Sequence, residues 1–312
     1  EEGLGKKYKP LATMFSLSGM IGCTIFFQAN QLSQIVREYL YNAAGIFQND
    51  IFLGDLFTGF IVATLVSIVI FGGIKRIALV ASRMVPVMVG IYLIAAIIVI
   101  GKNFQFVPGI FSLIISDAFT GNAVAGGAIG TMISIGVRRG LFSNEAGSGT
   151  ETMAHGAAKT KEPVREGLVA MLGPLIDTII VCSITALVIL LSGVYTQDLN
   201  GVSMTVAAFE NQLGVFGKVL IMIAVVTFSL STMFGYSYYG RKCTSYLFGT
   251  KWKQTYNLFY VSMIVVASTI SIDIAINFMD SAFALMVIPT MIATILLAPN
   301  VLKESRKYFR KI

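Results

Sequence analysis

Residues 138–155 read RRGLFSNEAGSGTETMAH. This stretch holds two arginines, two glutamates, three glycines and the only histidine of the chain, yet apolar sequence flanks it on both sides. A charged group at the centre of a bilayer costs about 2.5–3.5 kcal/mol on insertion scales. Glycine-broken backbone at that depth survives only when it is buried in protein or lines a cavity. We therefore expect this stretch to be functional.

The composition supports placing this stretch in a membrane. Of 312 residues, 55% are hydrophobic and only 12% are charged, against roughly 25% charged in ordinary soluble domains. This predicts an all-α, polytopic membrane protein whose surroundings are a lipid bilayer. The net charge of +7 therefore requires no nucleic-acid partner. Three cysteines without paired spacing argue against a disulfide framework or a metal site.

Hydropathy predicts eight membrane spans, because about 20 apolar residues are needed to cross a bilayer as a helix. The predicted spans are 11–36, 56–73, 79–101, 122–155, 167–192, 215–239, 257–276 and 281–299. With these spans, 18 of the 23 basic residues fall on the side that carries both termini. The positive-inside rule makes that side cytoplasmic, so we expect a multi-pass protein of the cell membrane with both ends of this chain inside.

The fourth predicted span is a discontinuous helix. Asn144 favours turns, and Gly147 and Gly149 flank Ser148. We expect an outer half-helix that ends near Phe142 and an inner half-helix that starts near Thr150. Freed carbonyls at such a break coordinate monovalent cations, and the N-terminus of the second half attracts a carboxylate.

Several ionisable groups lie at or near this break. Glu145 either pairs with Arg138 or Arg139 or contacts a cation or substrate directly. Asp177, ten residues into the fifth span, is a functional candidate because it is a carboxylate at membrane depth, or it caps or pairs with the broken span. Glu151 and His155 share one helical face. A membrane enzyme could use these two as acid and base, but no nucleophile, base and orienting group are visible together.

Two other spans carry polar groups. Near Phe27, the first span has polar side chains that suit a small zwitterion or that form helix–helix hydrogen bonds: Thr24, Gln28, Asn30 and Gln31. The sixth span has adjacent hydroxyls at Ser231 and Thr232. Such hydroxyls either bond back to their own helix or supply two oxygen ligands to a hard cation.

Several strings together resemble the alanine/glycine:cation symporter family, also called sodium:alanine symporters. The resemblance covers nearly the whole chain, and the strings that carry it are GGIKRI from 72, RGLFSNEAG from 139, AHGAAKT from 154, IDTIIVC from 176 and GYSYYG from 235, together with QAN from 28. In the fifth string the family has Trp where this chain has Tyr236. After Gly147, many members have Leu or Met and then Gly-Ser-Ala-Pro, whereas this chain has SGTET at 148–152.

The resemblance implies a leucine-transporter-type bundle of five-plus-five inverted repeats. Residues 1–121 would hold core helices 3 to 5 of the first repeat and an outer loop, 122–302 would hold helices 6 to 10, and 303–312 would be a basic cytoplasmic tail. The chain would begin just before core helix 3, so the opening two helices, which form half of the substrate site, would be missing from it.

The resemblance also implies sodium-coupled symport of alanine or glycine by alternating access, with no cofactor and no metal other than the coupling sodium ion. The expected sodium ligands are Ser231 and Thr232. Substrate binding is expected at Thr24, Phe27, Gln28, Phe142, Ser143, Asn144, Gly147 and Tyr236. Gating or structural charges are expected at Arg139, Glu145, Glu151 and Asp177. Proton coupling within the same fold, or a fragment unable to transport, stays open.

Overall fold

The computed structural model describes residues 3–119, 136–137, 139–140 and 143–311, and within these ranges the chain is helical and has no strand. Most of the first half of the predicted broken span lies outside the described residues, and so do Arg138 and Phe142. In chain order the labelled helices are α1 (Lys9–Gly22), α2 (Phe26–Val36), α3 (Asn42–Ala44), α4 (Ile51–Ile70), α5 (Gly73–Lys102), α6 (Val107–Phe119), α9 (Glu151–His155), α10 (Pro163–Ala170), α11 (Leu172–Pro174), α12 (Ser183–Ser192), α13 (Val202–Phe248), α14 (Lys253–Thr269) and α15 (Ile272–Phe309).

Wider and tighter turns join several of these helices. Two π-helical stretches, Arg37–Tyr41 and Leu175–Cys182, continue helical chain after α2 and after α11. Short 3₁₀ turns occupy Lys6–Tyr8, Phe104–Phe106, Val194–Thr196 and Thr250–Trp252.

Six helical stretches within the described ranges are long and apolar enough to cross a membrane: Lys6–Ala44, Ile51–Ile70, Gly73–Lys102, Pro163–Ser192, Val202–Phe248 and Ile272–Phe309. The chain is therefore a polytopic membrane protein. Of the eight predicted spans, the fourth falls half outside the described residues. The seventh corresponds to α14, which has 17 residues and rises about 26 Å at 1.5 Å per residue.

The boundary between the last two spans differs from the prediction. α14 ends at Thr269 and α15 begins at Ile272, so the predicted end at residue 276 is wrong. Ile270 and Ser271 are extended, and the Asn30 side-chain amide donates to the Ile270 carbonyl at 2.5 Å. This long-range bond satisfies a carbonyl that would be orphaned at the end of α14, so the chain leaves the helix earlier than hydropathy predicts.

The first predicted span is also interrupted, which the sequence analysis did not predict. α1 ends at Gly22, α2 begins at Phe26, and the Thr24 carbonyl accepts from the Phe26 amide at 2.8 Å in the tight connection between them. The chain thus has a second backbone break besides the one near Glu145.

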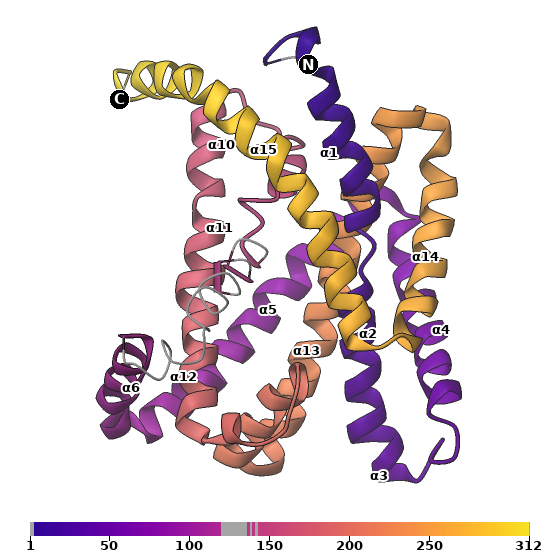
Figure 1. The fold of residues 1–312 in the computed structure, drawn as a ribbon, viewed down its shortest axis with the longest axis vertical. Coiled ribbons are helices and arrows are strands. Elements are labelled where there is room, and N and C mark those ends of the chain that lie inside the picture. Colours follow the sequence, from indigo (N-terminus) through magenta and orange to yellow (C-terminus); the bar gives the residue numbers. More distant parts are fainter. Residues whose placement is uncertain (1–2, 120–135, 138, 141–142, 312) are drawn as a thin grey trace. The chain divides into compact units, whose positions relative to one another are not determined.

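Packing divides the chain into two compact units, each considered by itself. The first comprises 1–81, 145–174 and 229–312. In it, α4 packs on α14, α1 on α15, and α2 on both α14 and α15 (Figure 1). α4 approaches α14 closely at Gly59, where a methyl group would overlap the Ser268 side chain and lie 3.2 Å from the Val265 Cα. Only glycine allows these two helices to pack this closely.

The second unit comprises 82–144 and 175–228. Its helices are joined by a hydrogen bond between the hydroxyls of Tyr92 and Thr185 and by the Asn103 amide, which donates to the Gln212 side chain at 2.8 Å. These units are defined by packing, whereas the predicted division at residue 121 rests on an internal repeat. The repeat division therefore stays a prediction.

Candidate functional site

The predicted break is visible in the backbone between residues 145 and 150. Glu145 has φ 59° and Gly149 has φ 77°, both in the left-handed region. That conformation costs a side-chain-bearing residue roughly 1–2 kcal/mol, so Glu145 is strained. A new helix, α9, begins at Glu151. The prediction that the inner half-helix starts near Thr150 is therefore confirmed.

The Glu145 carboxylate organises the interior of the break. The buried Thr150 hydroxyl donates to Glu145 Oε2 at 2.7 Å, and the Tyr236 hydroxyl of α13 is hydrogen-bonded to the same side chain. The Ser148 hydroxyl lies 3.0 Å from the Thr150 hydroxyl and donates to the Glu145 carbonyl at 3.0 Å. The structure thus brings together Glu145 and Tyr236, two residues that the sequence analysis had selected for different reasons.

Helix α15 packs against the break through Thr290. The Thr290 hydroxyl lies 3.1 Å from the Ser148 carbonyl and 2.8 Å from the Met286 carbonyl of its own helix. A methyl group on Gly149 would lie 2.6 Å from the Thr290 hydroxyl. Gly149 is therefore required both by its φ angle and by the approach of α15.

The interrupted first span lies beside the break, since a methyl group on Gly149 would lie 3.2 Å from the Phe15 ring of α1. Cys23, between α1 and α2, is fully buried. The Thr24 hydroxyl donates to the Ile21 carbonyl at 2.5 Å, so the α1 backbone uses that hydroxyl. Both backbone breaks therefore belong to the first packed unit.

The amides of α2 differ in how they are satisfied. Asn30 and Gln31 are buried and bonded, Asn30 to Ile270 and Gln31 to Asn30 and Gln34. Gln28 Oε1 is buried without a hydrogen-bond partner among the described residues. A buried acceptor that makes no hydrogen bond costs about 1–3 kcal/mol. A ligand that donates a hydrogen bond to Gln28 Oε1 would therefore recover free energy. Phe27 beside it is half-buried.

The hydroxyl pair of α13 lies one turn from Tyr236. Ser231 and Thr232 are half-buried, and Thr232 is four residues before Tyr236, on the same helical face. The Tyr260 hydroxyl of α14 donates to the Met233 carbonyl at 2.6 Å, which fixes this turn of α13 against its neighbour.

In the second unit, Ser143 and Asp177 meet. The Ser143 hydroxyl donates to Asp177 Oδ2 at 2.5 Å and lies 3.5 Å from the Cys182 sulfur. Asp177 is part of the π-helical stretch, and Arg139 is exposed. Asp177 thus bonds to a residue of the predicted broken span, and whether it also has a functional role stays a prediction. Asn144 and Gly147 follow Ser143 in the chain, and Gly147 is buried.

His155 bridges two carboxylates. Its Nε2 lies 3.4 Å from Glu151 Oε1, as their spacing on one helical face predicts, and its Nδ1 lies 2.7 Å from Glu166 Oε1 on α10. A methyl group on Gly173 would lie 3.2 Å from Glu151 Oε1, so α11 packs closely against this cluster. The bridge ties the inner half-helix to the beginning of the next span.

Sequence reasoning missed Thr150, Glu166 and Thr290 as partners of the break. Thr150 carried a usable signal, since a threonine just before a helix commonly hydrogen-bonds nearby backbone or side chains. Thr290 and Ser148 are 142 residues apart, and no local pattern links them. Among the described residues, no three His, Cys, Asp or Glu side chains are grouped to hold a metal ion.

Comparison with known proteins places this architecture in a family. The model of the sodium:alanine symporter family matches residues 1–312. The sodium/alanine symporter AgcS of Methanococcus maripaludis is 35% identical over 312 residues, which are 99% of this chain and 66% of that protein. The amino-acid carrier protein AlsT of Bacillus subtilis is 31% identical over 312 residues, 100% of this chain and 65% of that protein.

A third relative, the sodium/proton-dependent alanine carrier protein of Bacillus sp. (strain PS3), is 35% identical over 241 residues, 72% of this chain and 54% of that protein. The chain spans about two thirds of the length of AgcS and AlsT. The family is one of membrane transporters and not of enzymes. This chain belongs to the sodium:alanine symporter family.

Proposed function

We propose that the full-length protein carries small neutral amino acids, alanine or glycine, into the cell together with sodium by alternating access. The observation that carries this proposal is the broken helix at Glu145–Thr150, whose Gly149 lies against Phe15 of α1 and Thr290 of α15. Broken helices within a membrane mark the sites of secondary transporters, because they expose backbone donors and acceptors to a ligand. Family membership supports the coupling to sodium.

In this proposal the substrate ammonium donates to Gln28 Oε1, which has no partner among the described residues. The other substrate residues of this proposal are those that the family resemblance predicts, namely Thr24, Phe27, Phe142, Ser143, Asn144, Gly147 and Tyr236. Ser231 and Thr232 supply hydroxyl oxygens to sodium. Arg139, Glu145, Glu151 and Asp177 hold or gate the break. The two inverted repeats meet at residue 121, and both ends of the chain face the cytoplasm.

Uptake of labelled alanine by the full-length protein in proteoliposomes tests this proposal. We expect accumulation that requires an inward sodium gradient and that unlabelled glycine or alanine inhibits. Ser231→Ala with Thr232→Ala should raise the sodium concentration needed for half-maximal uptake. Ser262→Ala on α14, whose hydroxyl bonds its own helix in an exposed position, is the matched control. Undiminished uptake in sodium-free buffer would show that sodium coupling is wrong.

Proton coupling is the second candidate, and the His155 bridge favours it. An ionised carboxylate only accepts hydrogen bonds, and a neutral imidazole has one donor nitrogen. His155 Nδ1 lies 2.7 Å from Glu166 Oε1 and its Nε2 lies 3.4 Å from Glu151 Oε1, so the cluster could pass a proton between two carboxylates at the inner half-helix. Alanine uptake driven by a pH gradient at equal sodium on both sides would favour this candidate, and its absence would exclude it.

A further inference from the structure

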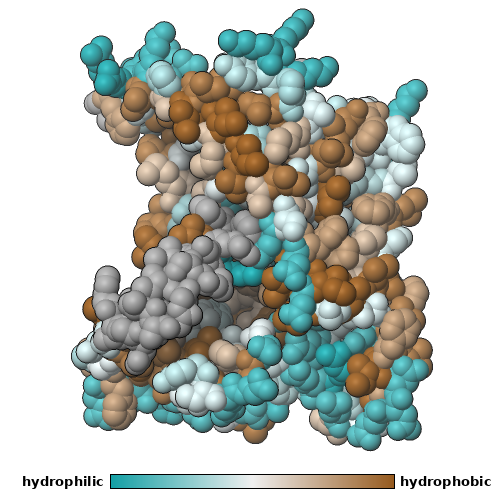
Figure 2. All heavy atoms as spheres, in the orientation of Figure 1, coloured by the Kyte–Doolittle hydropathy of each residue, from teal (hydrophilic) through white to brown (hydrophobic). Residues whose placement is uncertain are grey.

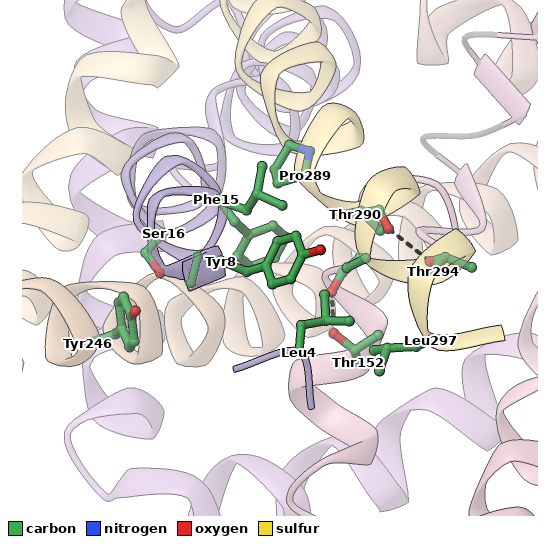
Figure 3. A pocket seen from close by; sticks show the side chains of 14 residues that line it. Leu4, Tyr8, Phe15, Ser16, Thr152, Tyr246, Pro289, Thr290, Thr294 and Leu297 are labelled. Atoms are coloured by element: carbon green, nitrogen blue, oxygen red, sulfur yellow. Dashed lines mark hydrogen bonds between the residues drawn. The ribbon is translucent and has the colours of Figure 1, made fainter. Parts of the chain in front are cut away.

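A cavity separate from the candidate substrate site lies in the first unit, between α1, α13 and α15 beside α9. Its volume is about 420 Å³, more than ten times the roughly 30 Å³ that one water molecule occupies in the liquid. None of the predicted substrate or sodium residues lines it. Figure 3 shows the residues around it, which are Leu4, Tyr8, Leu11, Ala12, Phe15, Ser16, Gly149, Thr152, Tyr246, Pro289, Thr290, Ala293, Thr294 and Leu297.

The threonine hydroxyls of this cavity already donate to backbone carbonyls, so they offer no hydrogen-bond donor to a solute. Thr152 donates to the Gly149 carbonyl at 2.6 Å, Thr290 to the Met286 carbonyl at 2.8 Å and Thr294 to the Thr290 carbonyl at 2.8 Å. With these hydroxyls bonded to the backbone, the aliphatic and aromatic walls dominate the lining (Figure 3). The chemistry therefore suits a hydrocarbon chain better than an amino acid.

The end of the cavity at the start of the chain is basic. Lys6, Lys7 and Lys9 flank Tyr8 in the sequence, and the Lys7 ammonium lies 5.0 Å from the centroid of the Tyr8 ring. On the opposite wall, α15 continues past Leu297 to Lys303, roughly 9 Å further along the helix axis at 1.5 Å per residue. In Figure 2, hydrophilic residues gather where the chain starts and where α15 ends, and hydrophobic residues follow α15 away from that end.

We propose that this cavity binds one acyl chain of an anionic glycerophospholipid whose phosphate group pairs with Lys6 and Lys7. The charge predicts the choice among lipids, since basic clusters at the cytoplasmic face attract anionic headgroups by about 1 kcal/mol per Lys, roughly a fivefold change in affinity. The predicted orientation places this end of the first unit at the cytoplasmic leaflet, where anionic lipids are found.

The position of the cavity gives the lipid a route to influence the break. Gly149 and Thr152 form part of its wall, and Thr290 contacts both the cavity and the Ser148 carbonyl. A chain packed in the cavity therefore supports the start of α9 in its present place. This effect on transport rests on the proposed symport function, whereas the binding of lipid does not.

Photo-crosslinking of the full-length protein tests the binding. Phosphatidylglycerol with a diazirine on its acyl chain should crosslink to peptides that contain Phe15 or Ala293, and phosphatidylcholine with the same chain should do so at least tenfold less. Lys6→Gln with Lys7→Gln should lower the phosphatidylglycerol signal about tenfold or more. Lys251→Gln with Lys253→Gln removes the same charge near another loop and should leave the signal unchanged.

Ala293→Trp fills the cavity and should abolish crosslinking of both lipids, provided that the variant elutes as a folded monodisperse protein. If it does not, competition by unlabelled phosphatidylglycerol against the wild-type crosslink makes the same test. Crosslinks spread over all lipid-facing helices, or equal labelling by both lipids, would overturn the proposal. Crosslinks in the cavity without any alanine uptake would leave the lipid site standing and refute the symport function instead.

Discussion

Replacing Gln28 by Met should stabilise the empty protein and weaken its binding of alanine. Gln28 Oε1 is buried without a hydrogen-bond partner among the described residues. A buried acceptor that makes no hydrogen bond destabilises the folded protein by about 1–3 kcal/mol. Met is of similar length and carries no such acceptor, so the unliganded variant recovers part of that free energy. With bound alanine, the same change removes a hydrogen bond from a charged ammonium, worth about 1.5–3 kcal/mol, or roughly 10- to 150-fold in affinity.

Thermal unfolding with and without alanine measures both effects in detergent. At 100 times its Kd, alanine should stabilise the wild type by about 2.7 kcal/mol. Gln28→Met should unfold at a higher temperature without alanine and should gain little from the same concentration. If it unfolds at a lower temperature and binds alanine as tightly as the wild type, the reasoning about Gln28 is refuted.

Gln31→Met is the matched control, since the same residue type lies one turn along the same helix. Its amide nitrogen donates to Asn30 Oδ1 at 3.2 Å and to Gln34 Oε1 at 3.0 Å. The substitution by Met removes this donor, so both acceptor oxygens lose a hydrogen bond. We expect a loss of stability of roughly 1 kcal/mol or more and unchanged stabilisation by alanine.

Three further substitutions should act on the break and on helix packing. Gly149→Ala should destabilise the protein by about 2 kcal/mol or more, measured by thermal unfolding, because it adds a Cβ at positive φ and 2.6 Å from the Thr290 hydroxyl. Glu166→Gln should cost roughly 1 kcal/mol through its bond to His155 and speed amide hydrogen exchange in α9. Gly59→Ala should cost about 1–3 kcal/mol through overpacking between α4 and α14, measured by denaturant unfolding.

Each of these substitutions has a control in the same chain. Gly167→Ala and Gly90→Ala place a methyl group in open space within α10 and α5, so each should stabilise its helix by up to about 1 kcal/mol. Glu162→Gln removes only an exposed pair with Lys311 at 3.9 Å and should change stability by less than about 1 kcal/mol. Equal effects in a substitution and its control would contradict the contact that motivates it.

The sequence predicted local features of the fold well. Apolar runs located the long helices, and the glycines at 147 and 149 located the break to within a residue of the observed start of α9. These signals are local, because helix propensity and hydropathy act over a few turns. The spacing of Glu151 and His155 likewise predicted their approach.

Features fixed by distant contacts could not be predicted. The end of α14 depends on a bond from Asn30 to the Ile270 carbonyl, 240 residues apart. The break in the first span at Cys23–Ile25 was hidden because hydropathy continues through it. Gln31 has hydrogen-bond partners and Gln28 Oε1 has none among the described residues. This difference depends on which side chains reach each glutamine in the fold. It could not be predicted from the sequence, because both positions hold the same residue type.

The π-helical stretch Leu175–Cys182 should let the span Pro163–Ser192 lose one residue without disturbing the rest of its helix. A π turn holds one residue more than an α turn, so deleting one residue within it converts it to an ordinary α turn. The side chains before and after the π-helical stretch would then stay on the same faces of the helix, although Asp177 itself would rotate. The deletion of a single residue, which would rotate every later side chain of a regular helix by about 100°, can therefore be absorbed here.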